Sequence, residues 1–239
     1  MPETIRFDNM SESISHDYYP LDLPLPHFLP NKDTPFTLIF QFAILWLSVL
    51  GAAFITIRRI RPTATKSDQL AFLWMCLTGC IHFFFEAYFV IKNPSLAGSD
   101  TLFGQLWKEY SLSDSRYLTS DTFLVCMEAV TAGAWGPLSF LTAYFILKQH
   151  PARHACQLIL STGQIYGDVL YYATSLMDLY TEGVSYCRPE GYYFWFYYFF
   201  MNFIWMAVGT YYATQSVKAI TKAFARVAVV DGEEAKKKR

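Results

Sequence analysis

The sequence predicts an all-α membrane protein, a bundle of five transmembrane helices with a lumenal N-terminal segment and a lumenal amphipathic connection. Of its 239 residues, 53% are hydrophobic and only 16% are charged, whereas a soluble domain has about 25% charged residues. Each of five mostly apolar stretches reaches the roughly 20 residues that a helix needs to cross the hydrocarbon layer. Strands of a membrane barrel would be about half as long and would alternate in polarity, so helices are favoured. The stretches are residues 36–57, 70–91, 122–147, 155–174 and 192–216.

The distribution of basic residues predicts the orientation of these spans. Lys and Arg cluster after the first, third and fifth stretches, while the other two connections carry at least as many acidic as basic residues. The positive-inside rule therefore places the N-terminus in the lumen and the C-terminus in the cytosol. We expect a Pro-rich lumenal segment at 1–35, a five-helix transmembrane domain at 36–217 and a cytosolic basic tail at 218–239.

The chain ends in Lys236, Lys237, Lys238 and Arg239. Lysines at the third and fourth positions from a cytosolic C-terminus resemble the dilysine signal that returns membrane proteins to the endoplasmic reticulum. The alternative is a solvated basic tail that attracts anionic lipid. The predicted orientation favours the signal, and hence a multi-pass protein of the endoplasmic reticulum membrane.

Composition argues against several other classes of function. A net charge of −1 gives no reason to expect nucleic acid as a partner, and the sequence has no glycine-rich phosphate loop. The five cysteines form neither a disulfide framework nor a CxxC metal pair. Cys76 and Cys80 are one turn apart and could bind a metal, but small apolar packing is the favoured interpretation of cysteines in a span.

The connection at 100–120 has apolar residues at helical spacing. This pattern predicts an amphipathic helix that lies on the membrane interface and could roof a cavity between the spans. The apolar residues are Leu102, Phe103, Leu106, Trp107 and Tyr110.

Three features should shape the ends and the course of the spans. Ser67-Asp68 and Ser120-Asp121 are the expected starts of the second and third spans, because their side chains can accept from free helix amides. Within the third span, Pro137 removes one backbone hydrogen bond and is expected to bend the helix. The bend would widen the bundle.

Ionisable residues inside the spans are the main candidates for function, because a charge at mid-membrane costs about 2.5–3.5 kcal/mol on insertion scales. His82 and Glu86 have i, i+4 spacing and share one helix face. Glu128 lies in the third span and Asp168 in the fourth. The alternative is that such groups only tie helices together by hydrogen bonds. Three of them in two neighbouring spans favour proton transfer, whereas Asp168 fits a structural network with Tyr166, Tyr171 or Arg153 equally well.

Polar and aromatic residues near these groups predict an apolar cavity. Thr131 and Trp135 follow Glu128 at i+3 and i+7, and Asn202 and Trp205 lie one turn apart in the fifth span. An aromatic stripe usually serves packing or an interface belt, but a buried amide needs partners. One histidine with distant carboxylates is not a convincing metal site, so we expect proton transfer on an apolar substrate.

At this point the chain resembles a known family, that of the emopamil-binding protein within the wider EXPERA-domain group, over residues 67–212. The resemblance implies a cofactor-free sterol Δ8–Δ7 isomerase of sterol biosynthesis. The similar stretches are GCIHFFFEAYFV (79–90), QLWKEYSLSDSRY (105–117), VCMEAVTAGAWGPLS (125–139), GQIYGDVLYY (163–172) and YFWFYYFFMNFIW (193–205).

The resemblance also implies roles for particular residues. His82, Glu86 and Glu128 would be catalytic, with a proton added at C9, a carbocation at C8 and a proton lost from C7. Our hypothesis is that Glu86, backed by His82, donates the proton and that Glu128 steadies the cation. The substrate-binding residues would be Thr131, Trp135, Asn202 and Trp205.

Partners follow from the same resemblance. A sterol would be the substrate, and cationic amphiphilic amines would bind by mimicking the carbocation between the two glutamates. A homodimer is implied by the family alone. Two other functions compete: an EXPERA protein that binds sterols or amines without catalysis, and a proton-coupled transporter, which is disfavoured because the five spans show no inverted repeat.

Overall fold

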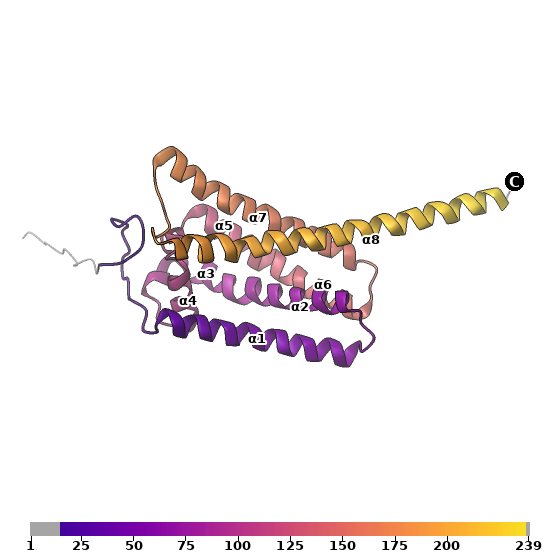
Figure 1. Cartoon of the computed structure of the whole chain (residues 1–239), viewed down its shortest axis with the longest axis horizontal. Coiled ribbons are helices and arrows are strands. Elements are labelled where there is room, and N and C mark those ends of the chain that lie inside the picture. The colour runs from indigo at the N-terminus through magenta and orange to yellow at the C-terminus, as the bar shows by residue number, and fades with distance from the viewer. Residues whose placement is uncertain (1–14, 238–239) are drawn as a thin grey trace, which may run out of the picture.

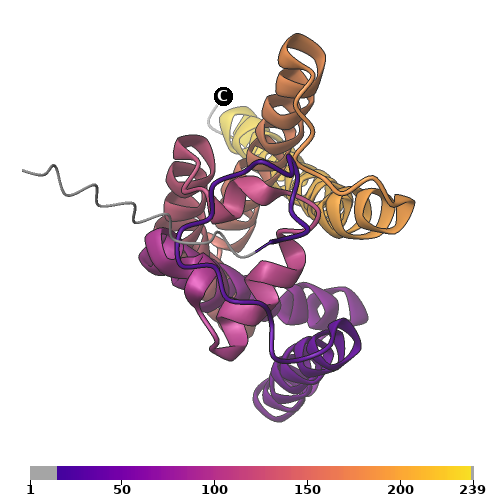
Figure 2. The same cartoon turned by 90° about the vertical axis from the view of Figure 1, so that its left-hand side faces the viewer.

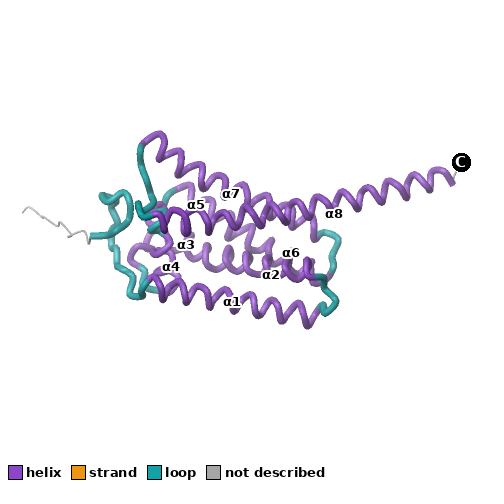
Figure 3. Tube along the Cα trace, viewed as in Figure 1, coloured by secondary structure: helices purple, strands orange, loops and turns teal. Residues whose placement is uncertain are grey.

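The computed structural model describes residues 15–237, which form helices and irregular connections without any strand (Figures 1 and 3). Three helical runs are long and apolar enough to cross a membrane: Pro35–Ile60, Lys66–Gly98 and Thr122–Lys148. The predicted all-α class is therefore confirmed, and the first three stretches have the length and composition of membrane-spanning helices. The elements are α1 (Pro35–Ile60), α2 (Lys66–Cys80), η1 (Ile81–Glu86), α3 (Ala87–Lys92), η2 (Asn93–Gly98), α4 (Leu102–Tyr110), η3 (Ser115–Leu118), α5 (Thr122–Val130), η4 (Thr131–Trp135), α6 (Gly136–Lys148), α7 (Arg153–Glu182), η5 (Tyr193–Phe200) and α8 (Met201–Lys237).

The fourth and fifth expected stretches form α7 and the continuous run of η5 and α8, which lie along the bundle beside each other (Figure 1). Their composition is more polar than that of the first three runs, because α7 carries Gln157, Gln164 and Asp168 and η5 is rich in tyrosine. Five membrane spans therefore remain a prediction. The helix α8 continues past the bundle to Lys237, so the described part of the expected basic tail is helical (Figure 1). The last two residues of the expected dilysine signal, and residues 1–14 of the N-terminal segment, lie outside the described range.

The expected interfacial helix at 100–120 is instead buried at one end of the bundle. The indole of Trp107 in α4 donates to the Phe85 carbonyl at 3.0 Å, which fixes one face of α4 to η1. Tyr18 of the irregular N-terminal segment donates to the Lys108 carbonyl at 3.1 Å and covers the other side. Figure 2 shows this segment crossing the end of the bundle. With both faces covered, α4 lines and closes one end of the cavity, so the expectation that this helix forms a roof is confirmed, whereas the helix is buried where an exposed interfacial position was expected.

Helix starts agree in part with the sequence. Asp121 caps α5 through its bond to the Leu124 amide at 2.9 Å, as expected. The start of α2 was expected at Ser67-Asp68, but its cap is Thr65, which accepts from the Asp68 amide at 3.1 Å. Ser67 and Thr65 can each accept from a free amide, and Thr65, which comes earlier in the chain, is the cap in the structure.

Three helical runs contain π-helical segments, and they do so around the same part of the bundle. These segments are η1, η4 and η5. A π-turn has a wider, weaker pattern of backbone bonds and is frequent at functional sites. In the third span, η4 ends just before Gly136 and Pro137, the first residues of α6, so the expected local disruption before this proline takes the form of π-turns.

The contact between η4 and α7 requires a glycine at position 163, where there is no room for a side chain beside Trp135. A Cβ added to Gly163 would lie 2.4 Å from Cζ2 of Trp135, which is far inside van der Waals contact. We expect Gly163→Ala to destabilise the protein by about 1–3 kcal/mol through overpacking, measured as a lower Tm in detergent. Gly133→Ala is the matched control, because a Cβ there meets nothing within 4 Å. Equal Tm values for the two variants would contradict this prediction.

Candidate active site

The two ionisable residues of the second span form a hydrogen-bonded pair in η1. Nδ1 of His82 lies 2.6 Å from Oε2 of Glu86, and its Nε2 lies 3.0 Å from the side-chain amide nitrogen of Gln164. An amide nitrogen only donates, so Nε2 of His82 accepts and the ring proton lies on Nδ1, directed at Glu86. The sequence prediction that these two side chains reach each other is confirmed.

Glu128 comes to the same place from the third span, and hydroxyl groups hold both of its carboxyl oxygens. Tyr117 donates to Oε1 at 3.0 Å, and the single hydroxyl proton of Thr131 is shared between Oε2 at 3.0 Å and the Glu128 backbone carbonyl at 2.9 Å. His82, Glu86 and Glu128 are all at most 9% exposed. Charge placed on Glu128 would therefore be held by two donors in a site shielded from solvent.

The last helix supplies an aromatic face and an amide. The ring of Trp205 lies 4.9 Å from that of His82, with 30° between their planes. The amide nitrogen of Asn202 donates to the Tyr110 hydroxyl at 2.8 Å and to the Tyr198 carbonyl at 2.6 Å. Asn202 is half-buried, and the partners expected for its amide are a tyrosine of α4 and the backbone of its own run.

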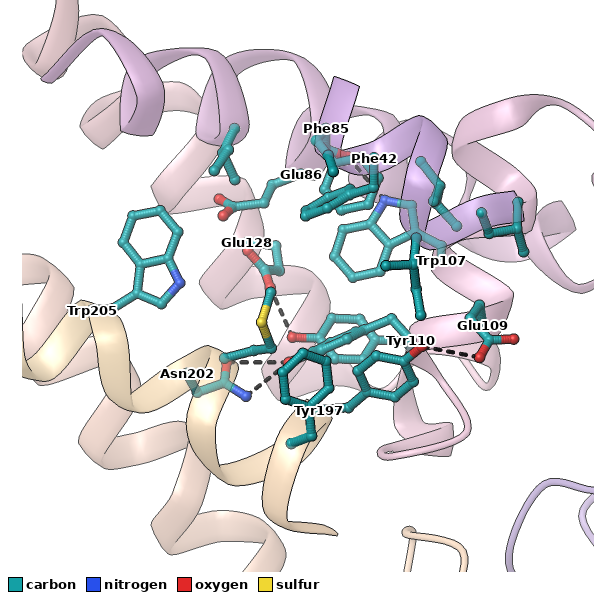
Figure 4. Close-up of a pocket in the computed structure, with 18 residues that line it drawn as sticks. Phe42, Phe85, Glu86, Trp107, Glu109, Tyr110, Glu128, Tyr197, Asn202 and Trp205 are labelled. Carbon is teal, nitrogen blue, oxygen red and sulfur yellow. Dashed lines mark hydrogen bonds between the residues drawn. The ribbon is translucent and has the colours of Figure 1, made fainter. Parts of the chain in front are cut away.

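A cavity of about 260 Å³ leads to these residues, between α1, η1, the roof helix α4 and the η5–α8 run. Most of its lining is apolar or aromatic, including Leu38, Phe42, Leu106, Trp107 and Met201. Figure 4 shows the carboxyl groups of Glu86 and Glu128 on one side, near Trp205, and Glu109 on the other side beyond the rings of Trp107 and Tyr110. The cavity can hold a long apolar molecule with polar groups at two places.

Glu109 marks the far end of this cavity. It is buried in α4 and accepts from the Tyr197 hydroxyl at 3.1 Å. Burial raises the pKa of its carboxyl above the usual value. The hydrogen bond from Tyr197 and the charge of Arg188 lower this pKa, but the effect of burial is larger. The sequence analysis missed Glu109, because an acidic residue on an amphipathic helix is ordinarily solvated.

Not every candidate reaches the cavity. Thr131, Asn202 and Trp205 line it or the smaller space beside it, but Trp135 lines neither and packs against Gly163. The expectation that Trp135 shares a face with Glu128 assumed regular α-helical turns. The π-turns of η4 lie between the two residues and shift the register.

Asp168 does not form the structural network that was considered for it. Arg153 binds Asp68 at the other end of the bundle, and no hydrogen-bond partner of the Asp168 atom Oδ2 is found among residues 15–237. Tyr166 is 65% exposed. Asp168 instead faces a small cavity beside the two glutamates.

Tyr117, Tyr110 and Gln164 are functional candidates that sequence reasoning did not single out. All three lie in the stretches that carry the family resemblance, at 105–117 and 163–172. Each of them lies between 11 and 92 residues from its hydrogen-bond partner, so no local sequence spacing indicates these contacts. Across the described part of the chain, no three His, Cys, Asp or Glu side chains are grouped as a metal site requires.

Comparison with known proteins decides the family. The family model EXPERA (EXPanded EBP superfamily) matches residues 102–216. The 3-beta-hydroxysteroid-Delta(8),Delta(7)-isomerase of Mus musculus is 38% identical over 209 residues, which cover 87% of this chain and 90% of the relative. The chain belongs to the EBP family of EXPERA proteins. The predicted resemblance is therefore confirmed.

Other relatives extend the match. The isomerase of the same name from Cavia porcellus is 35% identical over 208 residues, or 85% of this chain and 88% of the relative. An isomeliandiol synthase of Melia azedarach is 34% identical over 178 residues, or 73% of this chain and 81% of the relative. The EBP-family matches confirm the predicted enzyme class, an isomerase.

Proposed function

We propose that this EBP-family protein is a sterol isomerase that moves the nuclear double bond from C8–C9 to C7–C8. The observation that carries the proposal is the grouping of one imidazole and two carboxyl groups beside a long apolar cavity. A sterol is apolar over most of its length, and the double-bond shift needs only the addition and removal of a proton. The mammalian relatives are named for the same reaction, which supports the proposal.

Glu86 is the proposed acid. It gives its proton to C9, the electrons of the double bond form the new C9–H bond, and positive charge develops at C8. The C7–H bond then breaks: its electron pair becomes the C7–C8 double bond, and its proton passes to water at the site. His82 stays within 2.6 Å of Glu86 and steadies the carboxylate that remains after proton donation.

Glu128 is the proposed counter-charge to the cation. Its two hydroxyl donors, Tyr117 and Thr131, stabilise a carboxylate without neutralising it. The face of Trp205 adds cation–π attraction in a water-poor site. A protonated amphiphilic amine would be held by the same charge, so we propose that such amines compete with the sterol.

We propose that the sterol reaches the cavity from the lipid, between α1 and η5. Ile39 of α1 and Phe196 of η5 both line the cavity, yet they are 39% and 38% exposed on the outside of the bundle. The proposal includes the five-span topology, with the N-terminus in the lumen and the C-terminus in the cytosol of the endoplasmic reticulum. A cavity sealed from lipid in a sterol-bound structure would count against it.

Expression of the chain in cells that lack the isomerase tests the function directly. Membranes of these cells, supplied with a Δ8 sterol, are expected to form the Δ7 product, which mass spectrometry with a chromatographic standard identifies. If no product forms while a cationic amine still binds, the protein is a non-catalytic EXPERA binder. Membranes from the parent cells are the control.

Glu109 gives the proposal a test of substrate orientation. A sterol held with its double bond near Glu86 has one other polar group, the 3-hydroxyl, and Glu109 is an acceptor at the far end of the cavity. We expect Glu109→Leu to raise KM for a 3-hydroxysterol about tenfold, equal to about 1.4 kcal/mol for a lost hydrogen bond. The matched 3-deoxysterol should show no such change. An equal rise for both substrates would contradict the assignment.

A further inference from the structure

A second, smaller cavity of about 60 Å³ adjoins the proposed site on the side of α7. It shares Glu86, Glu128 and Trp205 with the large cavity, and it adds Gln164 and Asp168. The large cavity is mostly apolar, whereas polar side chains of the site make up a larger share of the lining of this one. The two spaces therefore meet at the groups proposed to handle the proton.

Three buried oxygen atoms of α7 residues that line this cavity have no protein partner. They are Oε1 of Gln164, Oδ2 of Asp168 and the hydroxyl oxygen of Tyr171, none of which has a hydrogen-bond partner within residues 15–237. Gln164 is only 5% exposed, and its amide nitrogen is already used by His82. Buried polar atoms of this kind are almost always bonded, often to ordered water. A space of 60 Å³ exceeds the roughly 10–15 Å³ that one water needs.

The ionisable groups that face this space come from four elements packed against it. His82 and Glu86 belong to η1, Tyr117 to η3, Glu128 to α5, and Asp168 and Tyr171 to α7. Arg153, the one arginine of α7, is bound to Asp68, and Arg116, which also contacts α7, is bound to Asp114, so neither neutralises Asp168. A carboxyl group that faces the interior of a membrane bundle without a cationic partner is a candidate for proton relay.

We propose that the small cavity holds water linking Asp168 to the His82–Glu86 pair, and that Asp168 is the proton reservoir that recharges Glu86 in each turnover. The inference rests on the proposed isomerase function. Glu86 loses one proton to C9, and one proton leaves C7, so the site gains and loses one proton per turnover. The C7 proton enters the water of the small cavity, is held on the Asp168 carboxylate, and returns through the same water to the Glu86 carboxylate.

The test compares Asp168→Asn with wild type in detergent or membranes. We expect kcat to fall about tenfold, less than the 100-fold or more expected on loss of a direct acid, because the amide that replaces the carboxyl can bind water but cannot carry the proton. KM for the sterol and the affinity for a cationic amine should be unchanged. The solvent deuterium isotope effect on kcat should increase, because proton return becomes the slow step. Asp168→Glu restores a carboxyl and should recover much of the lost rate.

Asp178→Asn is the matched control, since Asp178 lies on the same helix and only accepts from Tyr186 at 3.1 Å. An unchanged kcat and isotope effect in Asp168→Asn would overturn the inference, and so would parallel losses of rate, amine affinity and Tm, which indicate a structural role. A structure that resolves ordered solvent should show water bonded to Gln164 and Asp168, and a dry cavity would overturn the inference without any activity measurement. If wild type itself forms no Δ7 sterol, the proposed function fails first.

Discussion

Glu86→Gln is expected to lower kcat for the Δ8–Δ7 shift by about 10²- to 10⁴-fold, the usual contribution of a positioned general acid. Glutamine keeps the size of the side chain and can still bond to His82, which lies 2.6 Å from Glu86, but it has no proton to give to C9. Turnover of a Δ8 sterol by purified protein, followed as Δ7 product, measures the effect. A variant with full activity would end the assignment of Glu86 as the acid.

The affinity for a cationic amine distinguishes the proposed roles of Glu86 and Glu128. An acid must carry its proton when the substrate binds, so a neutral glutamine at position 86 should leave the affinity for a cationic amine nearly unchanged. Glu128→Gln removes the proposed counter-charge and should weaken both amine binding and catalysis. Loss of amine affinity in Glu86→Gln alone would exchange the two roles. Glu182→Gln, at the exposed end of α7, is the control for a change of charge on the surface.

The largest expected effect on stability is that of Arg116→Met. The guanidinium group is 2% exposed and donates to both carboxyl oxygens of Asp114, at 2.9 and 2.6 Å, and to the Thr174 hydroxyl at 2.8 Å. It also lies 5.4 Å above the ring of Tyr171. These contacts join the connection after α4 to α7. Removing the arginine leaves the Asp114 charge buried and unpaired, which costs about 3–5 kcal/mol.

We expect this loss to lower Tm in detergent by on the order of 10 °C. Adding Asp114→Asn to Arg116→Met removes the unpaired charge and should recover part of the Tm. Arg226→Met, on the exposed part of α8, is the control and should have the same Tm as wild type. If Arg116→Met also has the Tm of wild type, the buried Arg116–Asp114 pair does not hold the connection after α4 in place.

Much of the fold follows from local features of the sequence. Apolar stretches of sufficient length predict helices, because backbone groups inside a membrane must bond within their own segment. The pairing of His82 with Glu86 needs only i, i+4 spacing on one helix, and the structure places these atoms 2.6 Å apart. Trp135 was expected beside Glu128 from α-helical spacing, but η4 has π-turns and Trp135 lines neither cavity.

The sequence by itself determined the helical class, the apolar stretches, the His82–Glu86 pair and the family. Only the tertiary structure decided that Glu128 is held by Tyr117 of η3, that Gln164 of α7 binds His82, and that α4 is buried. The physical reason is distance along the chain. Helix formation and i, i+4 contacts depend on neighbours within one or two turns, whereas Gln164 and His82 are 82 residues apart and meet only when the helices pack.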